Sequence, residues 1–226
     1  MARRSRRRSK PDEAHVYWPQ RSVEDVIKEA GEFFEGRSAL HRAAERLRQR
    51  LEELGVPFAV AGGFALGAHG YRRLTEDVDI LVRKEDWHRF KQAFLGLGYT
   101  EVFAGSKAVR DTQDGVRIDP LYTGGFPGDG KPKPIAYPDP AEPGVVLPTP
   151  RFPVVSLDKL IELKVAAGMT APGRHLKDHV DVIELIRKNS LPATFVERLN
   201  PYVREKFLEL HAMAQEPDQV DERDEP

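Results

Sequence analysis

The sequence EDVDILV at residues 76–82 decides how the fold is organised. A β-strand alternates its side chains between two faces, so Asp77 and Asp79 would point one way and the apolar residues at the alternate positions would point into a core. Two carboxylates this close repel each other unless a cation lies between them. The stretch predicts a strand that carries a divalent metal site. An edge strand with two solvated acids is the alternative from this stretch alone.

Two further features strengthen the metal-site hypothesis. Gly62-Gly63 lies fifteen residues before Asp77, after a predicted strand and before a helical segment. A glycine pair there allows phosphate oxygens to approach backbone amides, and a helix N-terminus adds partial positive charge. Asp119 lies in the apolar stretch at residues 116–121 and is expected on a strand beside the first pair. Three carboxylates can hold two divalent cations, which suits phosphoryl transfer.

The remaining pattern predicts an α/β fold: a small mixed β-sheet flanked by helices, followed by a helical C-terminal region. Strands are expected over residues 57–61, 75–82, 106–110, 116–121 and 145–147, with an Asp-Gly hairpin turn at residues 114–115. Helices are expected over residues 22–34, 37–54, 86–97, 157–168, 176–188, 192–199 and 202–214. Residues 123–153 are rich in Gly and Pro, and such a long irregular stretch is usually functional or mobile.

The expected organisation has four parts. A basic disordered arm covers residues 1–20, with six basic groups and no acid in its first ten positions. The α/β core covers residues 21–150, the helical region residues 151–214, and an acidic disordered tail residues 215–226. The arm is able to contact phosphates non-specifically, and a solvated tail without such a role is the alternative.

Lys164 is out of place in its helix. It lies four residues after Leu160 and three after Ile161, within the apolar stripe of residues 157–168. A lysine there either snorkels to solvent or points into a polar cleft. Asp178 lies in the first turn of the next helix, where the helix dipole favours an acid.

The chain resembles the DNA polymerase β-type nucleotidyltransferase superfamily and, within it, the AbiEii-like nucleotidyltransferases. The motifs that carry the resemblance are, in order, Gly62-Gly63, Arg73-Leu74-Thr75, Asp77-Val78-Asp79, Arg117-Ile118-Asp119, Lys164 and Lys177-Asp178. They span roughly residues 55–190. One departure stands out, because the superfamily usually has Gly-Ser where this chain has Gly62-Gly63. Phosphate binding would then depend on amides or other side chains.

The resemblance implies a role for each of these residues. Asp77, Asp79 and Asp119 would be catalytic and would ligate Mg²⁺ or Mn²⁺, with Asp119 completing a second metal site and helping to deprotonate the acceptor. Phosphates of the nucleoside triphosphate (NTP) would be held by Gly62, Gly63 and Lys164. Asp178 would act as a partner of Lys164 or as an active-site group. Arg73 and Thr75 would position the nucleotide or, equally, anchor the approach to the strand.

The implied reaction transfers a nucleoside monophosphate from an NTP to an acceptor and releases pyrophosphate. The resemblance allows RNA, tRNA or protein as acceptor, and a toxin of a toxin–antitoxin pair with an antitoxin partner. A small-molecule acceptor is a weaker alternative. A catalytically silent nucleotide- or RNA-binding module is the non-enzyme alternative.

Composition excludes other classes. The 226 residues contain no cysteine, which rules out disulfides, thiolate zinc sites and a cysteine nucleophile, and favours a cytoplasmic protein. No apolar run approaches the roughly 20 residues of a membrane helix, so no membrane association is expected. Residues 125–131 match the start of a P-loop, but Pro132 replaces its Ser/Thr, and a loop or lid is expected instead.

Overall fold

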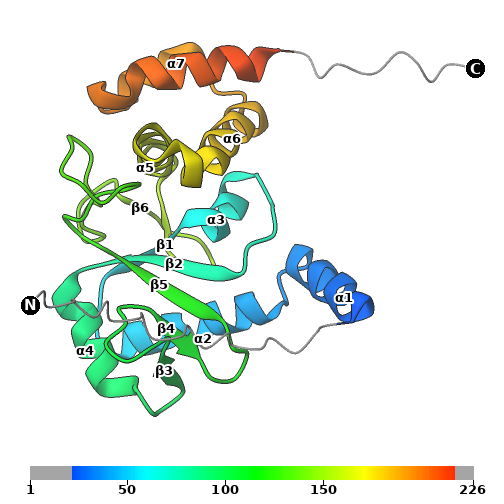
Figure 1. Cartoon of the computed structure of the whole chain (residues 1–226), viewed down its shortest axis with the longest axis vertical. Coiled ribbons are helices and arrows are strands. Elements are labelled where there is room, and N and C mark those ends of the chain that lie inside the picture. The colour runs from blue at the N-terminus through cyan, green and yellow to red at the C-terminus, as the bar shows by residue number, and fades with distance from the viewer. Residues whose placement is uncertain (1–21, 217–226) are drawn as a thin grey trace, which may run out of the picture.

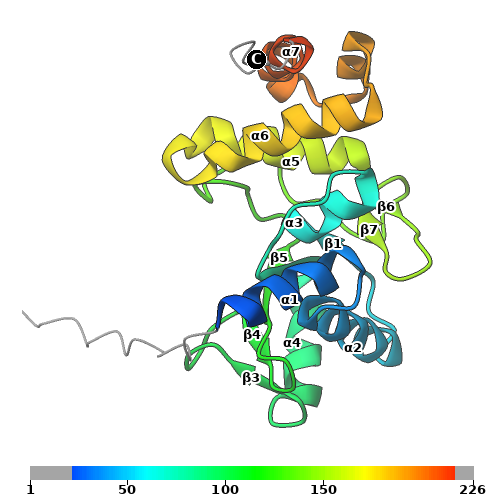
Figure 2. The same cartoon turned by 90° about the vertical axis from the view of Figure 1, so that its right-hand side faces the viewer.

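A mixed seven-stranded sheet forms the centre of the computed structural model, which describes residues 22–216. The strand order is β3-β4-β5-β2-β1-β7-β6. Helices α5, α6 and α7 stack on one side of this sheet, and α2 and α4 lie on the other (Figures 1 and 2). The predicted fold class is therefore confirmed. The predictions for the basic arm and for most of the acidic tail lie outside the described residues.

Three adjacent strands organise the sheet. β1 (Phe58–Ala61) pairs antiparallel with β2 (Asp77–Val82), and β2 pairs parallel with β5 (Arg117–Tyr122). The β2–β5 register places Asp79 opposite Asp119. The parallel pairing thus brings together carboxylates that are forty residues apart in the sequence.

The outer strands are short. β3 (Tyr99–Glu101) and β4 (Val109–Asp111) extend the sheet beyond β5, and β4 and β5 form the predicted hairpin. β6 (Val146–Leu147) and β7 (Val154–Val155) lie at the other edge, where β7 pairs parallel with β1. β3 and β7 have too few residues to produce a periodic pattern, so the sequence did not predict them.

The first helices cover one face and one edge of the sheet. α1 (Val23–Phe34) begins at a capping box formed by Ser22 and Asp25, and α2 (Ala39–Glu53) buries its stripe of Leu and Ala. A turn, α3 (Gly62–Ala65), continues into the 3₁₀ segment η1 (Leu66–His69). α4 is Lys84–Phe94. The prediction that this helix reaches Leu97 with an inward side chain is wrong, because Leu95 turns to an extended conformation and Leu97 is 69% exposed.

The C-terminal helices form a separate stack, seen side by side in Figure 2. α5 is Leu157–Thr170, α6 is Pro172–Asn189 and α7 is Pro201–Gln215, with the 3₁₀ segment η2 (Ala193–Arg198) before α7. α6 begins earlier than predicted because a helical turn precedes a kink at His175. Within residues 22–216, no helix is long and apolar enough to cross a membrane.

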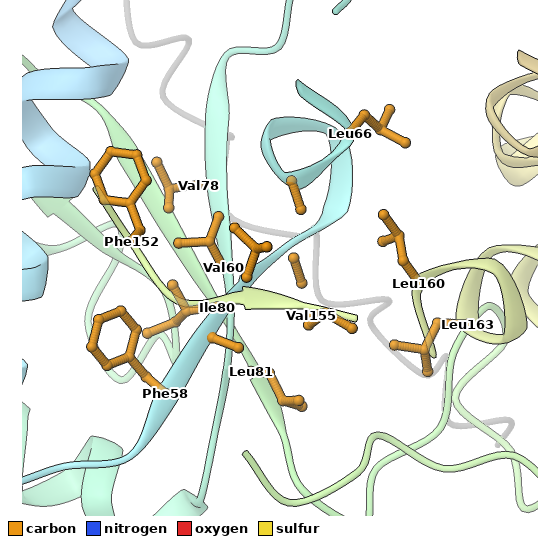
Figure 3. Close-up of a cluster of buried hydrophobic side chains, with 14 of the residues drawn as sticks. Phe58, Val60, Leu66, Val78, Ile80, Leu81, Phe152, Val155, Leu160 and Leu163 are labelled. Carbon is orange, nitrogen blue, oxygen red and sulfur yellow. The ribbon is translucent and has the colours of Figure 1, made fainter. Parts of the chain in front are cut away.

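The core fills both faces of the central strands (Figure 3). Phe58, Val78 and Ile80 lie on one side, while Leu160 and Leu163 of α5 lie on the other. Val78 and Ile80 are fully buried, as the alternation in β2 predicts. Leu81 is also fully buried, although it shares a face with the two aspartates. That face is therefore a cleft at the start of β2 and core at its end.

The full burial of Leu81 can be tested by replacing this side chain. Leu81→Ala should lower the free energy of unfolding by about 3 kcal/mol, since it leaves a cavity between the sheet and its cover. Leu147→Ala on β6, where the side chain is 42% exposed, is the matched control and should cost less than about 1 kcal/mol. Urea denaturation measures both variants. Equal losses would contradict the placement of Leu81.

Candidate active site

A cleft with a volume of about 260 Å³ opens between the sheet and helices α5 and α6. Eight of the predicted site residues line it: Gly62, Gly63, Arg73, Thr75, Asp77, Asp79, Lys164 and Asp178. Asp119 does not line it, although it lies opposite Asp79 on the neighbouring strand. The fold thus brings one dispersed set of polar residues to one place.

Asp79 has the most perturbed carboxyl group in the cleft. Its side chain keeps some exposure to the cleft but is largely enclosed by protein. Burial, followed by repulsion from Asp77 and Asp119, raises its pKa to about 7. The charges of Lys164 and Lys177 oppose this shift and do not cancel it. Three acids therefore act on one another here, as the sequence predicts.

Asp119 is held by a neighbour on its own strand. Arg117 lies two positions earlier, on the same face, and donates from Nε to Oδ2 at 2.5 Å and from Nη2 to Oδ1 at 2.9 Å. Within residues 22–216, no three His, Asp or Glu side chains are arranged to hold a metal ion. The expected triad is therefore adjacent in register but is not arranged to hold a metal ion, and both oxygens of Asp119 accept from Arg117.

Gly62 makes room for Asp79. Its φ is +60°, and a Cβ there would lie 1.9 Å from Oδ2 of Asp79. A side chain at this position is excluded twice, by the left-handed backbone and by the carboxylate. The sequence attributes the glycine pair to phosphate approach alone, whereas this contact gives Gly62 a second reason to be glycine.

The Arg73-Leu74-Thr75 motif contacts two different acids. Thr75 Oγ1 donates to Oδ1 of Asp77 at 2.9 Å. Arg73 donates from Nε and Nη2 to the two oxygens of Asp181, at 2.6 and 2.8 Å. Both side chains thus orient acids in or beside the cleft, and they tie the segment before β2 to α6 and to β2.

Lys164 points into the cleft, where two aspartates of α6 receive it. Its Nζ lies 2.8 Å from Oδ1 of Asp178 and 2.7 Å from Oδ2 of Asp181. The other oxygen of Asp178 lies 2.6 Å from Nδ1 of His175. Burial alone would raise the pKa of Asp178, but Lys164 and His175 outweigh burial and lower it. Lys164 is therefore a fixed cation at the wall of the cleft.

The Gly/Pro-rich loop closes one side of the cleft. Pro127, Gly128 and Tyr137 line it, and a Cβ on Gly128 would lie 2.9 Å from the carbonyl oxygen of Ala167 in α5. Burial, followed by the charges of Asp79 and Asp178, raises the pKa of Tyr137 to about 12. The stretch that matches the start of a P-loop is irregular and belongs to this wall of the cleft.

Three site residues were not assigned a role from the sequence. Asp181 was detectable, since it lies three positions after Asp178 and so faces Lys164 from the same side of α6. Arg117 was detectable as the residue two positions before Asp119 on a strand. Tyr137 had no local signal, because nothing in an irregular loop indicates which side chain turns inward.

No protein-family model matches the sequence, and no curated protein is significantly similar to it. Solved structures that resemble the chain include the antibiotic-resistance factor ANT(2'')-Ia, with 16% identity and a TM-score of 0.45 over 73% of this chain and 89% of that one. A proposed nucleotidyltransferase from Thermotoga maritima has 17% identity and a TM-score of 0.44 over 62% and 91%. A third, from H. pylori, has 16% identity and a TM-score of 0.38 over 77% and 92%. Similarity this low does not establish an activity for this chain.

Gly62 provides a test of the site's geometry. Gly62→Ala should lower the free energy of unfolding by about 1 kcal/mol for the left-handed backbone and by a further 1 kcal/mol or so for displacing Asp79. Gly55→Ala is the matched control, because Gly55 has a φ of +63° and nothing within 4 Å of the added Cβ. Chemical denaturation compares the two variants. Equal losses would contradict the contact between Gly62 and Asp79.

Proposed function

We propose that this protein is a metal-dependent nucleotidyltransferase, which transfers a nucleoside monophosphate from an NTP to an acceptor hydroxyl. The observation that carries the proposal is the β2–β5 register, which sets Asp79 opposite Asp119 and beside Asp77 at the edge of a cleft. The glycine turn and Lys164 line the same cleft. Membership of the AbiEii-like family, the toxin role and the antitoxin partner stay predictions from the sequence.

The carboxylates fit a hard divalent cation such as Mg²⁺ or Mn²⁺. Burial, followed by repulsion from Asp77 and Asp119, raises the pKa of Asp79 to about 7, so an added positive charge beside Asp77 and Asp79 would lower the free energy of the ionised pair. Carboxylate oxygens are the ligands that Mg²⁺ and Mn²⁺ prefer. A bound cation would neutralise charge on the triphosphate and activate the attacking hydroxyl.

Asp119 would join the site by exchanging its partner. Its two oxygens now accept from Arg117, which is 46% exposed at its side chain. Rotation of this arginine toward solvent, or toward a phosphate, would free the carboxylate. Arginine is well suited to the second role, since its planar fork matches phosphate geometry.

The opposite wall of the cleft would hold the triphosphate. Lys164 uses two of its three ammonium donors on Asp178 and Asp181, which leaves one for a phosphate oxygen. The backbone amides of Gly62 and Gly63 are further donors, because neither residue has a Cβ that would keep a phosphate away. Tyr137 offers an aromatic ring at the rim. Substrate and catalytic carboxylates would thus be held on facing sides.

In the reaction, the acceptor oxygen forms a bond to the α-phosphorus of the NTP. The bond from that phosphorus to the bridging oxygen of the leaving pyrophosphate breaks. The proton of the acceptor hydroxyl passes to a carboxylate, for which Asp119 is the proposed base. Positioning and charge stabilisation supply most of the acceleration in such transfers.

The test is label transfer from each of the four NTPs, with Mg²⁺ or Mn²⁺, to total tRNA, other RNA, protein and small-molecule acceptors of a cell lysate. Asp77→Asn should lower transfer about 1000-fold, because the loss of one metal ligand removes several kcal/mol of charge stabilisation. Its melting temperature should stay close to that of the unaltered protein, which excludes unfolding as the cause.

Glu205→Gln is the control, since this carboxyl on α7 is exposed and outside the cleft. It should leave transfer unchanged. Full transfer by Asp77→Asn would refute the metal assignment. NTP binding without transfer to any acceptor would favour the catalytically silent binding module.

A further inference from the structure

A second and larger hollow, with a volume of about 550 Å³, includes Phe64 of α3 and shares no lining residue with the cleft. It is formed by α1, α2, α3 and the segment before β7, which come together from separate parts of the chain. Its size falls in the range of small-molecule sites. None of the proposed catalytic or NTP-binding residues lines it.

Five rings run through this hollow in a continuous chain. Centroid separations are 5.6 Å for Phe34–Phe33, 5.4 Å for Phe33–His41, 4.9 Å for His41–Phe64 and 5.6 Å for Phe64–Phe152. Phe33 is partly buried against the core and Phe152 is buried, whereas Phe34 is 47% exposed. The ring of Phe34 is therefore available to a ligand.

Two arginines give the hollow its charge. Arg72 donates to the carbonyl oxygen of Phe34 at 3.0 Å, and the guanidinium of Arg151 lies 5.8 Å from the centroid of Phe152. Within residues 22–216, neither forms a salt bridge to a carboxylate. Glu35, the one acid of the lining, is paired with Arg37. Burial, then the charges of Arg151 and Arg72, lower the pKa of His41 to about 4.

The hollow is also continuous with a polar one. A neighbouring depression of about 430 Å³ shares Gly36, His41 and Arg151 with it and adds Glu45 and the arginines at positions 37, 42 and 46, each of which is paired with a carboxylate. A ligand longer than one nucleotide would lie across both. Rings that stack bases, next to cations that track a phosphate backbone, are the combination by which proteins bind single strands.

We propose that this surface, defined by Phe34, Phe64, Arg72, Arg151 and Phe152, binds single-stranded nucleic acid, with a base among the rings and phosphates at the two arginines. The surface goes beyond the proposed function, since it lies outside the cleft and needs no catalysis. It holds for RNA or DNA strands alike, because stacking and phosphate contacts do not read the sugar.

The experiment is fluorescence anisotropy of a labelled eight-nucleotide RNA with the full chain, without NTP or metal, so its outcome is independent of nucleotidyl transfer. Phe34→Ala should weaken binding roughly tenfold, because base stacking is lost. Arg151→Gln should weaken it as well and lower the slope of log affinity against log salt by about 0.7, which corresponds to one phosphate contact.

Arg198→Gln is the matched control. It removes the same charge from an exposed arginine that also stacks on a phenylalanine, with its guanidinium 4.9 Å from the centroid of Phe195. Binding by this variant should stay within about twofold of the unaltered protein. Binding by Phe34→Ala and Arg151→Gln that equals binding by the unaltered protein would overturn the proposal. The basic residues at positions 3–10 would then be sufficient to bind the RNA.

Competitors distinguish the class of ligand. Unlabelled single-stranded RNA should displace the probe, and inorganic polyphosphate of equal charge should do so much less well. Equal displacement by polyphosphate would overturn the role of the rings. Binding of AMP without binding of the oligonucleotide would overturn the assignment to single strands.

Discussion

Repulsion among carboxylates that the sheet forces together is the constraint on which the site depends. Parallel pairing of β2 with β5 sets Asp79 opposite Asp119, and alternation within β2 sets Asp77 on the same face. The distance between their Cα positions cannot increase without breaking the central ladder of the sheet. The neighbouring groups are arranged around that charge: Gly62 has no side chain to displace Asp79, Thr75 donates to Asp77, and Arg117 holds Asp119.

The charges of the cleft divide into two groups. On the helical side, Lys164 and Arg73 are matched by Asp178 and Asp181 through four hydrogen bonds. On the sheet side, Arg117 matches Asp119 alone. Asp77 and Asp79 are left without a cationic partner within hydrogen-bonding distance in residues 22–216. The negative charge is therefore concentrated at the two residues of the Asp-x-Asp motif.

Sequence reasoning succeeded where periodicity or spacing carries the information. Alternation in residues 76–82 predicted the central strand, and the lysine in an apolar stripe left two alternatives, of which the structure shows the cleft. It failed where tertiary contacts determine the local structure. Two-residue strands such as β7 have no period, and the inward turn of Tyr137 depends on a loop that packs on α5. The pairing of Arg117 with Asp119 is a rotamer choice, which no spacing encodes.

The two surfaces, both of which include residues of α3, have different chemistry. The cleft is lined by acids, with cations on the facing wall, whereas the other hollow is aromatic and carries Arg72 and Arg151, for which residues 22–216 provide no salt bridge. Phe64 of the aromatic chain directly follows Gly62-Gly63 in the sequence.

The affinity for Mn²⁺ as a function of pH, measured by calorimetry, tests the central claim most directly. Asp79 has a folded-state pKa of about 7. Below that pH the cation must displace a proton from Asp79, whereas above it the carboxylate is already ionised. Affinity should rise as pH increases toward 7 and level off beyond it, and Asp79→Asn should abolish both the binding and its pH dependence. Affinity that is the same at pH 5.5 and 8, or binding that survives in Asp79→Asn, would contradict a cation site built on these carboxylates.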